Sequence, residues 1–388
     1  MTGNKDDKIP LWRDERFWRI ALQVLAVLVF LLVVGVLGSN LNQNMQQLGI
    51  KFGFGFLGNA ASFDISESLI PYESSDPYSR VLLAGLLNSL RVIVLAIALT
   101  TGLGIAAGIA SFSDNWLLRK LSRVYVEVVR NTPLLLQLFF WYFAVFFSLP
   151  KLSEKIEWPG PIFLSKRGIY IPWPANSPAA WMWLAVVLVG AIAAVLLWRW
   201  RTKIMVERAA SGQQELIVLT VMGIAGIIII IFGLGWQRPE VTETGSIEGG
   251  LRLTIEYGAV LVGLIVHTGA FIAEIVRGGI QSVAKGQWEA ARSLGLKSGL
   301  AMRLVVFPQA LRVIVPSLNS QYINLAKNAS LALAIGYPDL YSVVNTTFNQ
   351  TGRPIEVILL FMITYLILDL IISLSMNLLN KAVQVKER

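Results

Sequence analysis

The 388-residue chain has no cysteine and only one histidine. The first absence excludes disulfide bridges, thiolate metal sites and thiol nucleophiles, and the second excludes a multi-histidine metal site. Charged residues are also scarce, at 15%, against about 25% in a typical water-soluble domain. Because 55% of the residues are hydrophobic and the mean hydropathy is +0.62, we expect an integral membrane protein.

Long apolar runs supply the membrane-spanning segments. A transmembrane helix needs ~20 predominantly apolar residues to cross ~30 Å of hydrocarbon. The predicted fold class is therefore an all-α integral membrane protein with about eight transmembrane helices, at residues 20–37, 92–112, 132–150, 179–198, 216–236, 257–276, 313–335 and 357–379. The first run follows a basic start, as a cleaved signal would, but its length and the lack of a small-x-small cleavage site favour a retained anchor.

The distribution of Lys and Arg predicts the orientation of these spans. With the N-terminus inside, 22 of the 33 basic residues fall in inner segments and 9 in outer ones. Basic residues accumulate in cytoplasmic loops, so both termini are expected in the cytoplasm. The net charge of +9 is then explained by topology, and no nucleic-acid partner is expected.

Three segments outside the spans differ in character. Residues 151–178 are rich in Pro and Trp, which suits an irregular outer segment at the headgroup boundary, and residues 237–256 read as a solvated outer loop. Residues 277–307 are too polar to span the membrane and too apolar for an ordinary loop. Gln287 to Leu294 favours a short helix that Gly295 can end, and Pro308 can open the next helix.

The faces of this short helix suit docking into a partner's groove. Trp288 and Ala291 share one face, where we expect Trp288 to anchor the partner, while Glu289 and Arg292 can pair on another face. On these grounds alone, a helix that rests on the membrane surface is the alternative.

Several strings in the chain resemble a known family. Glu289-Ala290-Ala291, then Gly295, then Val305-x-Phe307-Pro308 resembles the cytoplasmic EAA loop of permease subunits of binding-protein-dependent ABC importers. Three further strings resemble the polar amino-acid permeases of the histidine-permease type: RNTPLLLQLFF (130–140), FIAEIVRGGIQSV (271–283) and FPQALRVIVPSLNSQYINLAKNASLA (307–332). The outer strings GFGFL, FDISESLIPY and YPDLYSVVNTTFNQTG resemble the general L-amino-acid branch of that family.

The resemblance implies a type I ABC importer permease core and a domain plan. Its core covers about 83–149 and 251–380, whereas the segment 151–250 is not matched. We therefore expect an anchor helix with a periplasmic segment (1–82), the first part of the core (83–149) and an outer loop with two inserted helices (150–250). The second part of the core with the coupling loop 277–307 (251–380) and a cytoplasmic tail (381–388) follow.

The resemblance also implies partners. Two permeases form the pathway, and the resembled branch implies that they are two different, homologous chains. Two ATPase subunits dock on the EAA loops, and a periplasmic binding protein delivers amino acid to the bacterial inner membrane. The residues expected to couple to the ATPase are Gln287, Trp288, Glu289, Ala290, Ala291, Gly295 and Pro308. The chain holds no Gly-Lys dipeptide and so no P-loop, so ATP and Mg²⁺ are expected on the partner ATPase and no cofactor in this chain.

Ionisable and polar groups inside spans are costly and therefore mark candidate pathway residues. These are Arg91, His267, Thr268, Glu274, Gln321, Asn324 and Asn328. Each has a structural alternative: Arg91 can snorkel, His267 can be satisfied by a neighbouring helix, and Glu274 can pair with Arg277 or Lys327. Gln321, Asn324 and Asn328 share one helical face, which suits a solvated pathway or a subunit interface.

Two rival functions remain to be weighed. An autonomous secondary carrier or channel could use the same polar groups, but it leaves the segment 277–307 unexplained. An intramembrane enzyme lacks a credible catalytic set, since the spans hold one His, no Cys and no acidic cluster. The sequence therefore favours a transport subunit that is not itself an enzyme.

Overall fold

The computed structural model describes residues 15–47, 52–208, 213–242 and 246–383, which fall into two compact units divided after Asn59. In the first unit, α1 (Glu15–Gln47) is one continuous apolar helix of 33 residues. At ~1.5 Å per residue it is more than long enough to cross a bilayer. It contains the span predicted at 20–37, and a short 3₁₀ turn (Gly55–Gly58) follows it.

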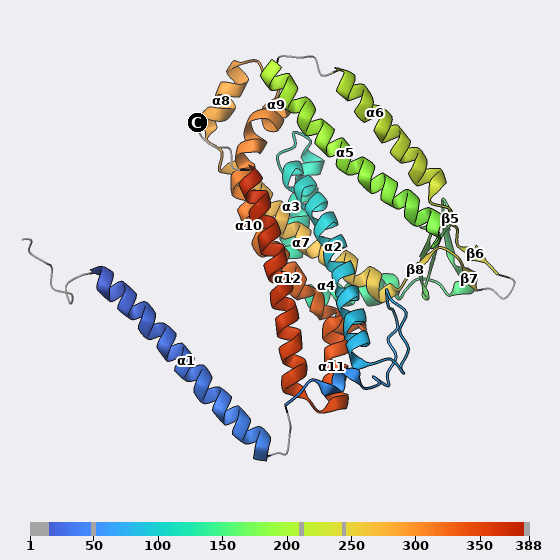
Figure 1. Ribbon diagram of the computed structural model, residues 1–388. Coiled ribbons are helices and arrows are strands. Elements are labelled where there is room, and N and C mark those ends of the chain that lie inside the picture. The colour runs from blue at the N-terminus through green and yellow to red at the C-terminus, as the bar shows by residue number, and fades with distance from the viewer. Residues whose placement is uncertain (1–14, 48–51, 209–212, 243–245, 384–388) are drawn as a thin grey trace, which may run out of the picture. The chain divides into compact units, whose positions relative to one another are not determined.

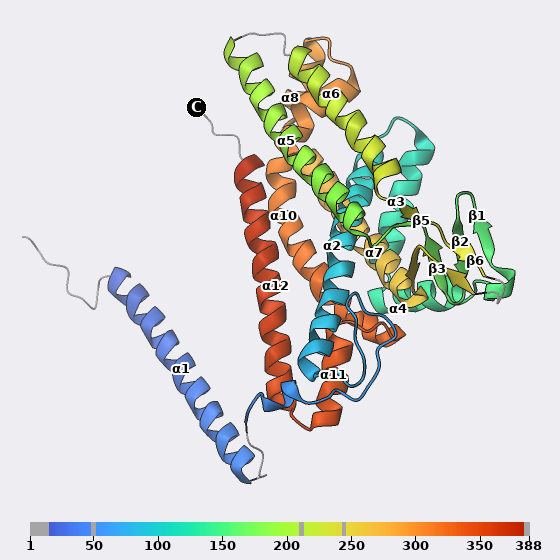
Figure 2. The same ribbon diagram turned by 45° about the vertical axis from the view of Figure 1, so that its right-hand side comes forward.

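The second unit is built around four long helices that run side by side (Figures 1 and 2). They are α2 (Tyr78–Ala110), α7 (Ile255–Gln281), α10 (Phe307–Asn328) and α12 (Pro354–Val383). Contact is most extensive between α2 and α7. There a Cβ at Gly104 would lie 2.4 Å from Ile272, and a Cβ at Gly108 would lie 2.6 Å from Val276. These two glycines therefore let the helices approach closely.

The span predicted at 132–150 is instead the outer half of a broken element. Helix α3 (Trp116–Arg130) is followed by α4 (Leu134–Phe139) and a π-helical turn (Phe140–Phe146), with a bend of 108° between the two parts. Residues 134–146 are too short to cross the membrane alone. Helix α3 has an apolar face and a charged face, so its sequence reads as a polar connection rather than a span.

The inserted segment contains strands that an all-α fold did not predict. Strands β1 (Ile156–Trp158), β2 (Ile162–Ser165), β3 (Gly168–Ile171) and β8 (Leu251–Leu253) form an antiparallel sheet in that order. Two small pairs join β4 (Trp173–Pro174) to β5 (Trp236–Gln237), and β6 (Glu240–Val241) to β7 (Ile247–Glu248). Both predicted outer loops, 151–178 and 237–256, are thus partly strand, and β8 leads directly into α7.

Between these strands the chain makes a helical hairpin. Helix α5 (Pro178–Arg208) packs along α6 (Gln213–Ile228) and its π-helical continuation (Ile229–Gly233), as Figure 2 shows. These two helices contain the spans predicted at 179–198 and 216–236. Almost none of their apolar surface is buried within the chain, which suits helices that face lipid.

The inner and outer connections of the core are also helical. Helices α8 (Lys285–Ser293) and α9 (Ser298–Ala301) and a π-helical turn (Met302–Val306) lead into α10. After α10, a 3₁₀ helix (Ala329–Ile335) and α11 (Leu340–Thr351) lead to α12. Among the described residues, seven helices are long and apolar enough to span, or eight if the bent α3–α4 element counts as one span. The expectation of about eight spans is confirmed.

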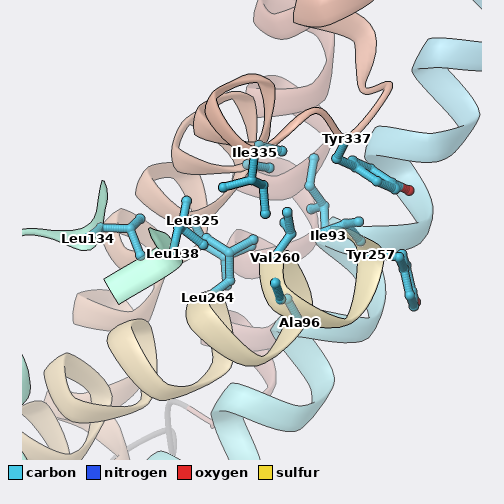
Figure 3. Packing of buried hydrophobic residues seen from close by; sticks show 14 of the residues in the cluster. Ile93, Ala96, Leu134, Leu138, Tyr257, Val260, Leu264, Leu325, Ile335 and Tyr337 are labelled. Carbon is cyan, nitrogen blue, oxygen red and sulfur yellow. The ribbon is translucent and has the colours of Figure 1, made fainter. Parts of the chain in front are cut away.

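One buried cluster joins several segments of this core (Figure 3). Leu138 from the broken span and Leu264 from α7 are fully buried and pack with Leu325 from α10. Ile93 on α2 and Tyr337, before α11, complete the cluster. Five elements distant in sequence therefore share one core, which holds the broken span against α7.

Candidate functional site

The predicted docking segment folds as a short helix with a glycine exit. Helix α8 covers 285–293, close to the predicted 287–294, and Gly295 has a φ of +73°, where residues with a Cβ are strained. The amide of Leu296 donates to the Ala291 carbonyl at 3.1 Å and that of Gly295 to Arg292 at 2.8 Å, which closes the helix end. Pro308 lies in the first turn of α10, as predicted.

One face of α8 is exposed, although Gln287 on it accepts a hydrogen bond from Gln309 at 3.1 Å, and the other face packs on the chain itself. Gln287, Glu289 and Ala290 are exposed, as are Gly295 and Pro308 beyond the helix. Leu294, next to Gly295, is 81% exposed, an unusual position for an apolar side chain outside a span. Nothing in the sequence alone distinguished Leu294 from the other apolar residues of this segment.

Trp288 and Ala291 lie on one face of α8, as predicted. The Trp288 ring is half-buried and packs against the cluster formed by the C-terminal part of α7 and the start of α10. Ala291 is 2% exposed. Trp288 also lines a cavity of about 630 Å³ with the C-terminal end of α2, and its role as an anchor for a partner stays a prediction. Among the described residues, Glu289 and Arg292 form no ion pair.

A polar cavity of about 680 Å³ lies beside α7. It is lined by the inner end of α2, by the charged face of α3 and by the inner half of α7. Its ionisable lining residues carry both signs: Arg123, Glu127, Arg130, Glu274 and Arg277. Charged groups at this depth persist only when they are paired or face water, so the cavity is the strongest candidate for a solvated pathway.

Glu274 is the centre of the charges in this cavity. Arg277 holds its carboxylate with two hydrogen bonds, of 2.9 Å from Nε and 2.5 Å from Nη2. Arg130 of α3 adds a nitrogen at 3.8 Å, and its guanidinium lies over the Phe271 ring at 5.3 Å. The ion pair with Arg277, one of the two predicted alternatives, is present, whereas the other predicted partner, Lys327, pairs with Asp369 instead.

His267 lies one turn of α7 outward from Phe271, and their rings are 5.1 Å apart. Its Nδ1 is 3.0 Å from Nε2 of Gln137 on α4. Thr268 is 3% exposed and does not face the cavity. The structural alternative for His267, a hydrogen bond to a neighbouring helix, is therefore present, and sequence reasoning did not single out Gln137.

The polar stripe of α10 lies on a different surface. Asn324 is exposed, and Gln321 and Asn328 are partly exposed on the same face. None of the three lines the cavity beside α7. The single chain thus brings Glu274 and His267 to one region and the stripe to another.

Lys327 belongs to the surface of the stripe. Its ammonium lies 3.5 Å from Asp369 of α12, and its side chain is 58% exposed. Both residues line a largely apolar groove of about 530 Å³ with Tyr365 and Phe361. Their presence inside spans was visible in the sequence, but not that they pair.

Arg91 is placed away from both surfaces. Its guanidinium bonds Glu67 at 2.6 Å and lies 3.8 Å from the centre of the Tyr257 ring. Thr254, which caps the N-terminus of α7, donates to the other Glu67 oxygen at 2.5 Å. In this structure the carboxylate partner of Arg91 therefore comes from its own chain, from Glu67, a distant residue that sequence could not match to it. The assignment of Arg91 to the substrate pathway stays a prediction.

Among the described residues, the seven or eight candidate spans, the charged cavity beside α7 and the exposed face of α8 fit a membrane transport subunit. The chain belongs to the family of binding-protein-dependent transport system inner membrane components, whose model matches residues 100–385. It is therefore a multi-pass permease component of a transport system, and not an autonomous carrier.

Named relatives agree with this assignment over the full length. YhdX of Escherichia coli, provisionally named as an amino-acid ABC transporter permease, is 43% identical, with 94% of each chain covered. AapQ of Rhizobium johnstonii, a general L-amino acid transport system permease protein, is 39% identical over 100% of both chains. A solved amino acid ABC transporter with histidines is 21% identical, with a TM-score of 0.47 over 79% of this chain and 95% of that one.

Proposed function

We propose that the chain is the permease subunit of an ATP-driven importer of amino acids. The observation that most directly supports this proposal is the cavity in which Glu274 lies between Arg277 and Arg130. An amino acid carries an ammonium and a carboxylate together, and a lining with both signs provides a partner for each. The names of the full-length relatives support the same cargo.

The pathway is completed by a second permease. A span surface that carries Lys327 and three polar residues is costly against lipid, so it is more stable against water or protein. A second, homologous permease can cover this surface. The polar stripe and the cavity beside α7 then contribute to one pathway between the two subunits.

ATP is hydrolysed on separate cytosolic subunits. The exposed face of α8, with Glu289, Ala290 and Leu294, offers the docking surface. In this arrangement both termini are cytoplasmic, the strands of the insertion face the periplasm, and a binding protein delivers cargo to the bacterial inner membrane.

Reconstitution into proteoliposomes tests this function. The complete set, comprising this chain, a second permease, the ATPase and the binding protein, should accumulate labelled amino acid only when ATP is inside and binding protein outside. The chain alone should neither hydrolyse ATP nor concentrate amino acid. Concentrative uptake by the lone chain would overturn the proposal.

A further inference from the structure

The break between α3 and α4 is stabilised by hydrogen bonds from its own side chains. Ending a helix leaves the carbonyl groups of its last turn without intrahelical partners. Here Asn131 Nδ2 donates to the Glu127 carbonyl at 2.7 Å, and the Thr132 hydroxyl donates to the Val128 carbonyl at 2.8 Å. The Val129 carbonyl accepts from Gln137 at 2.9 Å. Three successive carbonyls of the last turn of α3 thus accept hydrogen bonds from side chains of the break.

Gln137 makes the connection from the break to α7. Its side chain is 8% exposed, and Nε2 lies 2.9 Å from the carbonyls of both Val129 and Thr132 and 3.0 Å from His267 Nδ1. The opposite amide orientation would set Oε1 against two carbonyl oxygens, so the carbonyls fix nitrogen on this side. The nitrogen has two hydrogens for these three acceptors, so one hydrogen is shared between two of them. A hydrogen on His267 Nδ1 would point at the amide hydrogens, so Nδ1 is unprotonated and accepts.

The orientation of Gln137 determines the proton position on His267. A neutral imidazole whose Nδ1 accepts a hydrogen bond carries its proton on Nε2. The ring contacts Phe271, which lines the cavity together with Arg130. His267 therefore lies directly behind Phe271 in the wall of the cavity.

The surface of α7 is shaped to receive the break. A Cβ at Gly263 would lie 2.6 Å from Leu138, the fully buried residue after Gln137. A Cβ at Gly269 would lie 2.7 Å from the Tyr125 hydroxyl, which donates to the Val266 carbonyl. Both halves of the broken span are thus seated on α7, on either side of His267.

Packing alone does not explain the choice of glutamine. Gln137 Oε1 is buried and has no hydrogen-bond partner among the described residues. An unsatisfied buried acceptor costs free energy that an apolar side chain of similar size would not. The role of the Gln137 amide therefore lies in the contacts of its nitrogen with Val129, Thr132 and His267.

We propose that Gln137 is a positioning residue of the translocation pathway: it fixes the α3–α4 break beside the cavity and keeps His267, which lies behind the cavity residue Phe271, in the Nε2–H tautomer. The proposal rests on the proposed function in that the cavity is taken as the pathway. The positions of the break and of the imidazole proton can be tested without transport.

The single histidine makes the tautomer directly measurable. The full chain, labelled with ¹⁵N-histidine and carrying an affinity tag free of histidine, is studied in lipid nanodiscs by solid-state NMR. Wild type should show the Nε2–H form only, and Gln137→Leu should add the Nδ1–H form. The matched control Thr132→Val, which removes a hydrogen bond of the break without touching His267, should leave the tautomer unchanged. An Nδ1–H wild type, or a spectrum that Gln137→Leu does not alter, overturns the proposal.

Transport in the reconstituted complex supplies the second readout. Gln137→Leu should lower amino-acid uptake about tenfold at an unchanged amount of assembled complex, and adding His267→Phe to it should cause little further loss, because residues that act together are not additive. Additive losses, or unaltered uptake by Gln137→Leu, contradict positioning through His267. If no preparation transports amino acid but the NMR results hold, the proposed cargo fails while the geometry of the break stands.

Discussion

At the scale of single residues, the cavity keeps one carboxylate between two guanidinium groups. Arg277 satisfies both oxygens of Glu274, and Arg130 approaches from a different helix. The group is therefore a contact between α3 and α7 as well as a charge in the cavity. A cargo with its own carboxylate or ammonium can exchange with either partner, which an isolated structural pair would not allow.

Replacing Glu274 by Gln tests this exchange. The amide keeps the shape of the side chain but leaves Arg130 and Arg277 without a counter-charge, so we expect uptake by the reconstituted complex to fall by about tenfold or more. The amount of assembled complex should stay near wild type. Glu248→Gln, on the exposed outer strand β7, is the matched control and should transport normally. Equal uptake by both variants would assign Glu274 to structure.

Asp339 should make the stability of the fold depend on pH. Burial raises the pKa of this carboxyl to about 7, although its Oδ1 caps α11 by accepting from the Ser342 amide at 2.8 Å. The folded state then binds a proton between about pH 4 and pH 7 that the unfolded chain releases, so stability falls as pH rises through that window.

Asp339→Asn keeps the cap but cannot ionise. We expect its melting temperature in detergent to change less between pH 5 and pH 8 than that of wild type, and to be the higher of the two at pH 8. The same slope in both proteins would show that Asp339 does not carry this dependence.

The sequence could identify the polar residues whose burial in the membrane costs free energy wherever they lie within a span. Glu274, His267 and Lys327 stand out as polar groups in apolar runs. The partner of Glu274 could be read, because Arg277 lies three residues away. The partners of His267 and Lys327 could not, because Gln137 and Asp369 lie far away in the chain and meet them only after folding. For the same reason the Glu67 partner of Arg91 was missed.

At the scale of elements, α8 separates a surface offered to a partner from one used by the chain. Ala290 is exposed, whereas its neighbour Ala291 is 2% exposed. Ala290→Trp should leave the chain folded but weaken its association with the ATPase, because the new ring holds the partner away. Ala291→Trp should lower the thermal stability of the permease itself, since overpacking strains a buried site.

Co-purification of the ATPase and thermal unfolding in detergent distinguish the two alanine variants. If Ala290→Trp retains the ATPase in full, the exposed face of α8 is not the docking surface. If it is Ala290→Trp rather than Ala291→Trp that loses stability, the orientation of the helix is different from the one described.

The end of α8 provides a second comparison, between two glycines. Gly295 has a φ of +73°, whereas Gly286 lies inside the helix, and an added Cβ would meet nothing within 4 Å at either position. Gly295→Ala should therefore change the exit of the chain through backbone strain alone, and reduce binding-protein-stimulated ATPase activity several-fold. Gly286→Ala should retain activity, and Gly295→Asn should lose less than Gly295→Ala because Asn tolerates this conformation better. Equal activity of all three would exclude the glycine turn from coupling.

The elements that sequence could predict were those whose pattern is local. Uninterrupted apolar runs gave α1, α5, α6 and α12, and the glycine after a short helix-forming run gave the end of α8. The part of α2 between Tyr78 and the predicted start at residue 92 was missed because Arg80, Asn88 and Arg91 interrupt its apolar run. Helix α3 was missed because its charged face, which lines the cavity, reads as a polar connection. The strands β1 to β3 were missed because they are short and lie in a segment rich in Pro and Trp. The sheet also includes β8, which lies far along the chain and pairs with β3 only after folding.

At the scale of the whole molecule, the core and the α5–α6 hairpin are separable. The hairpin buries its surface mainly between its own two helices, and its ends meet at one point, where the Ala175 amide donates to the carbonyls of Leu234 and Gly235 at 3.2 Å. Strands β4 and β5 pair directly outside this point. The hairpin is thus an insertion whose two ends are held together by the β4–β5 pair.

Excising residues 176–234 and joining Ala175 to Gly235 through Asn-Gly should preserve the permease. The linker makes a two-residue turn between the paired strands β4 and β5, and because one inward and one outward span are removed together, the orientation of α7 and of the coupling loop is unchanged. We expect the shortened chain to assemble with its partners and to retain ATP-dependent uptake within about threefold of wild type, since each core contact is kept. A matched excision of α6 alone should abolish uptake, because it inverts every span that follows. If the paired excision also abolishes assembly while the shortened chain remains folded in detergent, the lipid-exposed surface of the hairpin is instead a contact surface for another subunit.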